Sequence, residues 1–117
     1  MNYRNLEVYQ LAVRFLPMTT KMIDRFPAGY ASFADQMRRA SLSVPLNIAE
    51  GSGKTGPADQ RRFYAIARGS AMECGAIVDA CFALGFIDQA ARKQALDTLD
   101  SIVRILSKMC LSNRTKK

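Results

Sequence analysis

Residues 47–56 read NIAEGSGKTG, and the letters GSGKT within them resemble a phosphate-binding loop. That loop has the pattern GxxxxGK[ST] and lies between a strand and a helix. When Gly53 and Lys54 are aligned to the pattern, its first glycine falls on Ile48, so the turn-forming glycine is missing. The preceding residues have helical spacing, and a helix C-terminus presents carbonyl groups and the negative end of its dipole. The stretch therefore predicts a helix end followed by a turn, and it disfavours nucleotide hydrolysis.

Helical periodicity continues outward from this stretch in both directions, and proline and glycine divide the chain into four segments. Pro57 suits the first turn of a helix, Gly85 suits a helix stop, and Asp88 suits an N-cap. The pattern predicts helices at about 6–26, 31–51, 57–84 and 88–111, with a frayed tail at 112–117. Four amphipathic helices with short loops predict a single all-α domain over residues 1–117, an antiparallel four-helix bundle with up-down-up-down topology.

The segment 6–26 carries two apolar stripes, of which one, containing Ala12 and Leu16, suits the core of the bundle. The second stripe lies roughly opposite, and two leucines of the next segment also point away from the core face. A row of exposed apolar residues is unusual in a monomer, although single exposed ones are common. We therefore expect a homo-oligomer whose interface contains Leu11, Phe15, Met18, Met22, Leu42 and Leu46.

Pro45 lies inside the second helical segment, where it cannot donate a hydrogen bond to the carbonyl four residues earlier. Asn47 and nearby serines supply polar groups for the backbone that the resulting kink leaves open. Gly51 is expected to help stop the helix, and Glu50 to pair with Lys54 four residues on. We interpret Pro45, Asn47, Glu50 and Gly51 as a structural motif rather than a catalytic one.

The residue types disfavour catalysis and metal binding. Histidine is absent, which removes the commonest general base and metal ligand. Cys74 and Cys81 are seven residues apart, or about 10.5 Å along a helix, which is too far for a disulfide. With Cys110 they suit a reducing compartment. We expect no enzyme activity, cofactor or metal and, because no apolar run spans a bilayer and no signal peptide begins the chain, a cytoplasmic protein without a membrane partner.

The chain carries a net charge of +7, and residues 86–117 alone have seven basic and three acidic side chains. A basic surface favours RNA, DNA or acidic proteins. Some of these cations have acidic neighbours, and Asp35 is placed to pair with Arg39. The predicted function is nucleic-acid binding by an oligomer with repeated basic patches; the alternative is a protein-interaction scaffold whose charge only solubilises it. The candidate contacts are Arg38, Arg39, Lys54, Arg61, Arg62, Arg104, Lys108, Arg114, Lys116 and Lys117.

Several short motifs resemble those of the ribosomal RNA intervening-sequence proteins, a family of four-helix bundles. They are FP at Phe26, QxxRA from Gln36 to Ala40, SxPxNIAEG from Ser43 to Gly51, and IAxGSxxE from Ile66 to Glu73. The opening LEVYQLA is similar too, with Tyr9 where the family often has tryptophan, and Gly29 stands where a glutamate is common. The likeness covers about residues 5–110, and NIAEG is its most specific part.

The resemblance implies a small bacterial cytosolic bundle that assembles into a homopentameric ring. In some bacteria the gene of such a protein lies within an insertion in large-subunit ribosomal RNA. Relatives in diversity-generating retroelements are thought to bind nucleic acid and a reverse transcriptase. No catalytic residues are established for the family, so the resemblance supports a self-associating, non-enzymatic protein.

Overall fold

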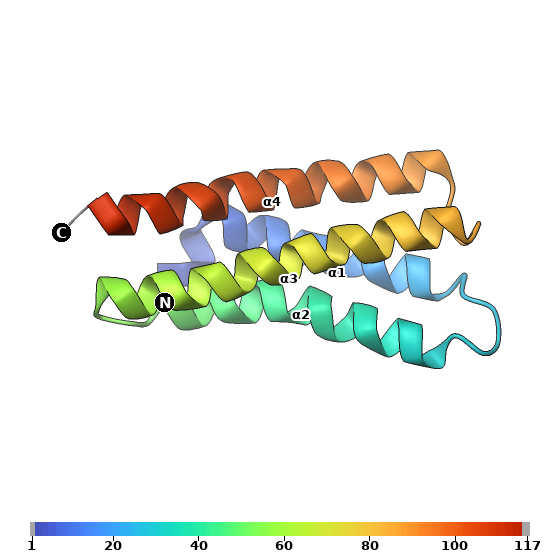
Figure 1. Ribbon diagram of the computed structural model, residues 1–117, viewed down its shortest axis with the longest axis horizontal. Coiled ribbons are helices and arrows are strands. Elements are labelled where there is room, and N and C mark those ends of the chain that lie inside the picture. The colour runs from blue at the N-terminus through green and yellow to red at the C-terminus, as the bar shows by residue number, and fades with distance from the viewer. Residues whose placement is uncertain (1, 116–117) are drawn as a thin grey trace.

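The computed structural model describes residues 2–115, and for residues 112–115 it describes the backbone alone. A short 3₁₀-helix, η1 (Asn2–Asn5), precedes four α-helices, which are α1 (Glu7–Ile23), α2 (Ala31–Ser52), α3 (Pro57–Ala83) and α4 (Gln89–Thr115). The described residues contain no strand. The four helices lie side by side along the longest axis of the molecule (Figure 1), whose extents are 49 × 22 × 20 Å.

The observed helix bounds agree closely with the predicted bounds in the middle of the chain and less closely at its ends. α1 ends at Ile23, three residues before the predicted end, and α2 runs one residue past Gly51 to Ser52. α4 runs to Thr115, beyond the predicted end at 111, and the expected fraying of the tail stays a prediction. The last two residues of the predicted tail lie outside the described residues.

The turn between α3 and α4 shows why a glycine ends α3. Gly85 has φ of +80°, a left-handed conformation that costs a residue with a Cβ but suits glycine. Its N–H donates to the carbonyl of Phe82 at 3.0 Å, and the N–H of Phe86 donates to that of Cys81 at 2.9 Å. These two bonds form a Schellman motif, which satisfies the last carbonyls of the helix. Asp88 then caps α4, because its Oδ1 accepts the N–H of Ala91 at 2.8 Å.

The bundle has one core, to which all four helices contribute. The largest fully buried side chains include Phe15 of α1, Met37 and Ile48 of α2, and Ile102 and Leu106 of α4. α3 contributes mostly small residues, such as alanines and cysteines. Such residues allow neighbouring helices to approach closely, and the buried apolar surface is the main source of stability.

The core corrects the expected orientation of α1. Phe15 and Met22, which were assigned to an outward stripe, have only 1% and 4% of their surfaces exposed. The observed core face of α1 lies between the two predicted stripes and contains Val8, Ala12, Phe15, Thr19 and Met22. The expected outward orientation of Phe15 and Met22 is therefore wrong, because these side chains are already covered by their own chain.

The other predicted interface residues differ in exposure. Leu11 and Met18 are half-buried and pack against the core. Leu42 and Leu46 remain exposed, at 47% and 63% of their surfaces, as does Val13 of α1. An oligomer interface therefore stays a prediction, and it rests on Leu42 and Leu46 rather than on a row along α1.

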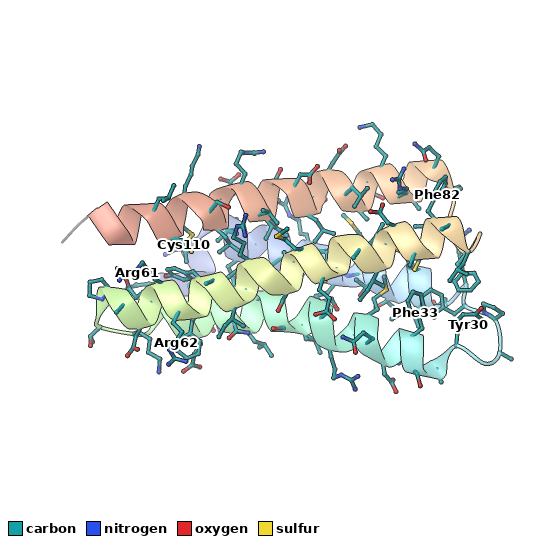
Figure 2. All side chains as sticks on the ribbon, in the orientation of Figure 1. Tyr30, Phe33, Arg61, Arg62, Phe82 and Cys110 are labelled. Carbon is teal, nitrogen blue, oxygen red and sulfur yellow. The ribbon has the colours of Figure 1, made fainter. Side chains whose placement is uncertain are left out.

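Aromatic rings close one end of the bundle. Phe26 lies 5.3 Å from both Phe33 and Phe86, centroid to centroid, and Tyr30 meets Phe86 edge-on at 4.8 Å. All four side chains are half-buried. Figure 2 places Tyr30 and Phe33 at this end, beside the connection between α1 and α2. The cluster joins that connection to the one between α3 and α4, since Phe86 belongs to the latter.

Substituting alanine at two glycines separates backbone strain from packing. A Cβ at Gly85 or at Gly69 meets no atom within 4 Å, but Gly85 alone has a positive φ. We expect Gly85→Ala to destabilise the fold by about 1–2 kcal/mol, the cost of a left-handed alanine. Gly69→Ala, inside α3, is expected to stabilise it by about 0.5–1 kcal/mol. Chemical denaturation measures both, and equal effects at the two sites would contradict the assigned turn.

Candidate nucleic-acid interface

The GSGKT segment does not form a phosphate-binding loop. Gly51 lies inside α2 and is buried, and the C-cap of the helix is Gly53, whose N–H donates to carbonyls of its own helix. A Cβ at position 51 would lie 2.8 Å from Cε1 of Tyr64 on α3. Gly51 is therefore needed for the close approach of α2 to α3, not for the helix stop that its position in the sequence predicted.

The remaining polar residues of the motif join α2 to α3. The side-chain amide of Asn47 donates to the carbonyl of Ser43 at 2.8 Å and to its hydroxyl at 3.0 Å. The hydroxyls of Ser43 and of Ser70, on α3, lie 2.7 Å apart. Pro45, which lies between Ser43 and Asn47 in the sequence, is buried. Asn47 thus bonds the carbonyl of Ser43 rather than the one that Pro45 leaves open, and the network it forms is structural.

Glu50 and Glu73, the carboxylates on neighbouring helices, have different partners. Glu50 pairs with Lys54 at 3.1 Å, as the spacing predicts. Glu73 accepts a hydrogen bond from the side-chain amide of Gln36 on α2. Among the described residues, no group of three or more acidic or cysteine side chains is placed to hold a metal ion.

Burial makes two of the cysteine thiols unreactive. It raises the pKa of Cys74 to about 12, with a further contribution from the nearby negative charge of Glu73, and raises the pKa of Cys81 to about 11. Both thiols therefore stay neutral at physiological pH, and a neutral thiol is a poor nucleophile and metal ligand.

No helix within the described part of the chain is long and apolar enough to cross a bilayer.

The structure brings two of the predicted cations, Lys54 and Arg62, together on the ring of Phe63 where α3 begins. The Lys54 ammonium lies 5.1 Å and the Arg62 guanidinium 4.5 Å from the ring centroid of Phe63. Figure 2 places Arg61 and Arg62 at this same end of the bundle. Lys54 is however paired with Glu50, and Arg62 lies 3.9 Å from Asp59. Their charge is partly neutralised by carboxylates on the same surface.

The other predicted contacts do not join that group. On α2, Arg38 pairs with Asp35 at 3.0 Å, so the expected Asp35–Arg39 pair is wrong; Arg39 instead donates to the side-chain oxygen of Gln36. On α4, Arg104 and Lys108 are exposed and one helical turn apart. The side chain of Arg114 and the whole of Lys116 and Lys117 lie outside the described residues.

The structure reveals a basic row on α1 that the sequence analysis missed. Arg14, Lys21 and Arg25 are exposed, and none of them forms an ion pair with a described carboxylate. The spacing of seven residues places Arg14 and Lys21 on one face of α1, and Arg25, in the turn two residues after α1 ends, lines the same groove. This spacing is the signal that would have found them. Asp24 is three residues from Lys21, but it lines the groove between α1 and α2 instead.

The basic row borders a groove between α1 and α4. The groove has a volume of 310 Å³, and no acidic residue is among the described residues that line it. The other two grooves differ in charge: the one between α1 and α2 contains Asp24, and the one between α3 and α4 contains Asp79 and Asp100. The lining residues of the α1–α4 groove are Arg14, Pro17, Met18, Lys21, Met22, Arg25, Ile87, Ala91 and Gln94.

Residues 4–108 match the family described as 23S rRNA-intervening sequence protein. The matched range covers η1 in part, α1, α2 and α3 in full, and most of α4. It therefore includes both the basic row and the network between α2 and α3. No curated protein sequence matches the chain.

The close approach at Gly51 gives a direct test of the motif. Gly51→Ala places a Cβ against the buried ring of Tyr64, and we expect it to destabilise the fold by about 1–3 kcal/mol, the usual cost of overpacking. Gly53→Ala is the matched control, because its Cβ would lie 3.6 Å from the nearest atom, an ordinary contact. Chemical denaturation compares the two variants, and an undiminished stability of Gly51→Ala would contradict the packing.

Proposed function

Because the chain belongs to the 23S rRNA-intervening sequence protein family, we propose that it is a non-enzymatic, oligomeric four-helix bundle that binds nucleic acid. The observation that carries this proposal is the basic row of Arg14, Lys21 and Arg25. These cations are exposed and have no carboxylate partner among the described residues.

Unpaired cations suit phosphate contacts better than paired ones. An arginine held by a carboxylate must give up that partner to bind a phosphate, whereas a free one exchanges only water and counterions. The ion pairs with Asp35, Glu50 and Asp59 thus weaken Arg38, Lys54 and Arg62 as contacts. Arg104 and Lys108 of α4, which form no ion pair with a described carboxylate, stay as secondary contacts in the proposal.

Self-association would multiply a row of three cations. We place the subunit interface on Leu42 and Leu46, since exposed leucines of this size favour burial against a partner. The proposed assembly is a homopentameric ring of antiparallel, up-down-up-down bundles. Asp79 of α3 contacts Arg92 near the start of α4, and Arg68, earlier in α3, contacts Ser107 later in α4. The two helices therefore run in opposite directions, which agrees with that topology. Each ring would repeat the basic row in every subunit, and linked sites bind a long polyanion more tightly than one site does.

A protein-interaction scaffold is the second candidate. The exposed leucines of α2 support it, since they are compatible with a different protein as well as with a second copy. In that case the net charge of +7 would serve solubility. The two functions differ in whether affinity for nucleic acid depends on the basic row, which a set of charge-matched variants measures.

Replacing Arg14, Lys21 and Arg25 together by glutamine tests the nucleic-acid contacts. Log affinity falls linearly with log salt concentration, and each lost phosphate contact reduces the magnitude of this slope by about 0.7 for a single strand or 0.9 for a duplex. We therefore expect the slope to fall by about 2–3 and the affinity at low salt to fall steeply. Fluorescence anisotropy with labelled RNA and DNA at several salt concentrations measures both quantities.

The matched control replaces Arg38, Arg62 and Lys93 by glutamine. It removes the same net charge, but from residues that are paired with Asp35, Asp59 and Asp97. We expect a small change in affinity and slope. Equal losses in the two triple variants would show that only total charge matters, and no binding by the unaltered protein at low salt would sink the nucleic-acid proposal.

An aspartate on α2 tests the subunit interface. We expect Leu46→Asp to lower the assembly mass, because a charge at a buried contact costs several kcal/mol unless it is paired. Ile66→Asp on α3 is the control, since Ile66 is also an exposed apolar residue, at 42% of its surface, but lies on a helix outside the proposed interface. Light scattering gives the mass of each, and an unchanged mass for Leu46→Asp would refute this interface.

A further inference from the structure

The groove between α1 and α4 combines a charged rim with an apolar floor. Arg14, Lys21 and Arg25 project from one side of it, and Gln94 is the exposed polar residue on the other. The floor consists of apolar side chains that are half-buried or buried, namely Met18, Met22, Ile87 and Ala91. Its volume of 310 Å³ lies within the range of about 300–1,000 Å³ that is usual for sites of small organic groups.

Aromatic residues lie next in the chain to two residues at the groove between α1 and α4. Two of its lining residues, Arg25 and Ile87, are sequence neighbours of Phe26 and Phe86, whose ring centroids are 5.3 Å apart. Tyr30 packs edge-on against Phe86. No aromatic ring is among the described residues that line the groove, so its apolar surface is the floor itself.

We propose that this groove binds single-stranded nucleic acid, with phosphates on the basic row and unstacked bases against the apolar floor. The proposal rests on the proposed function and specifies its ligand. A duplex presents phosphates outward and hides the faces of its bases, so it would use the rim and leave the floor unfilled. A single strand offers both charges and base faces, which is the combination that this groove matches.

The charge of the groove favours this occupant over an apolar or basic peptide. Three cations line one side of an apolar floor, and no carboxylate lines the groove among the described residues. A neutral helix would leave those cations without counter-charge when it excluded water from them, which is costly. A strand with one phosphate per base supplies a charge for each cation and an apolar face for the floor.

The test compares single-stranded and duplex oligonucleotides of one sequence against the whole protein. We expect the single strand to bind at least about fivefold more tightly, the lower limit for one additional base contact. Equal or tighter binding of the duplex would overturn this inference but leave the proposed function standing. No binding of either would remove both.

A floor-filling variant separates base contacts from charge. Ala91→Leu leaves the rim intact but occupies the floor, so we expect it to weaken single-strand binding by about fivefold or more, with an unchanged salt slope and unchanged duplex binding. Ala90→Leu is the matched control, because Ala90 is the preceding residue of α4, is exposed and does not line the groove. Thermal unfolding checks that both variants fold.

Competition with a peptide completes the test. An unlabelled single strand should displace the labelled one, whereas a polyglutamate peptide of equal charge should do so at least about fivefold less well, because it has no bases for the floor. Equal competition by the peptide, or equal effects of Ala91→Leu and Ala90→Leu, would show that the groove recognises charge alone and would overturn the proposal.

Discussion

The rotation of α1 about its own axis decides what the bundle buries and what it presents to solvent. Burial of Phe15 and Met22 fixes that rotation, because successive residues of a helix lie about 100° apart and so every other side chain follows. Arg14 and Lys21, one residue before each of them, are then turned to the edge where α1 meets α4. The same constraint thus builds the core and aligns the cations beside the groove.

Charge neutralisation divides the basic residues into two kinds. Arg38 of α2, Lys54 of the following turn and Arg62 of α3 each lie about one helical turn from a carboxylate. The structure pairs them with Asp35, Glu50 and Asp59 respectively. Such exposed pairs contribute little to stability, but they reduce the charge that is available to a ligand. The basic row along α1 and the turn after it has no such partner in the described part of the chain, so a modest number of cations there produces a surface of one sign.

The segment that resembles a phosphate-binding loop has a different physical role. Its glycine at position 51 lets α2 approach Tyr64, and the upstream Asn47 and Ser43 connect α2 to Ser70 of α3. Small size and hydrogen bonds of this kind hold two helices at close range. The motif is therefore explained by packing, and this explanation removes the need for a nucleotide there.

The sequence by itself determined the number of helices, their approximate bounds and the turn chemistry of Gly85 and Asp88, because these depend on residues close together in the chain. It also identified Ile48 as the residue that breaks the phosphate-loop pattern. It did not determine the rotation of α1, since both apolar stripes satisfy helical periodicity and the observed core face, which lies between them, depends on the shapes of three other helices. Tertiary structure alone decided that Phe15 is buried, that Gly51 touches Tyr64, and that Arg14, Lys21 and Arg25 border a groove free of described carboxylates. Each of these is a relation between helices that are distant in sequence, and packing rather than local propensity sets it.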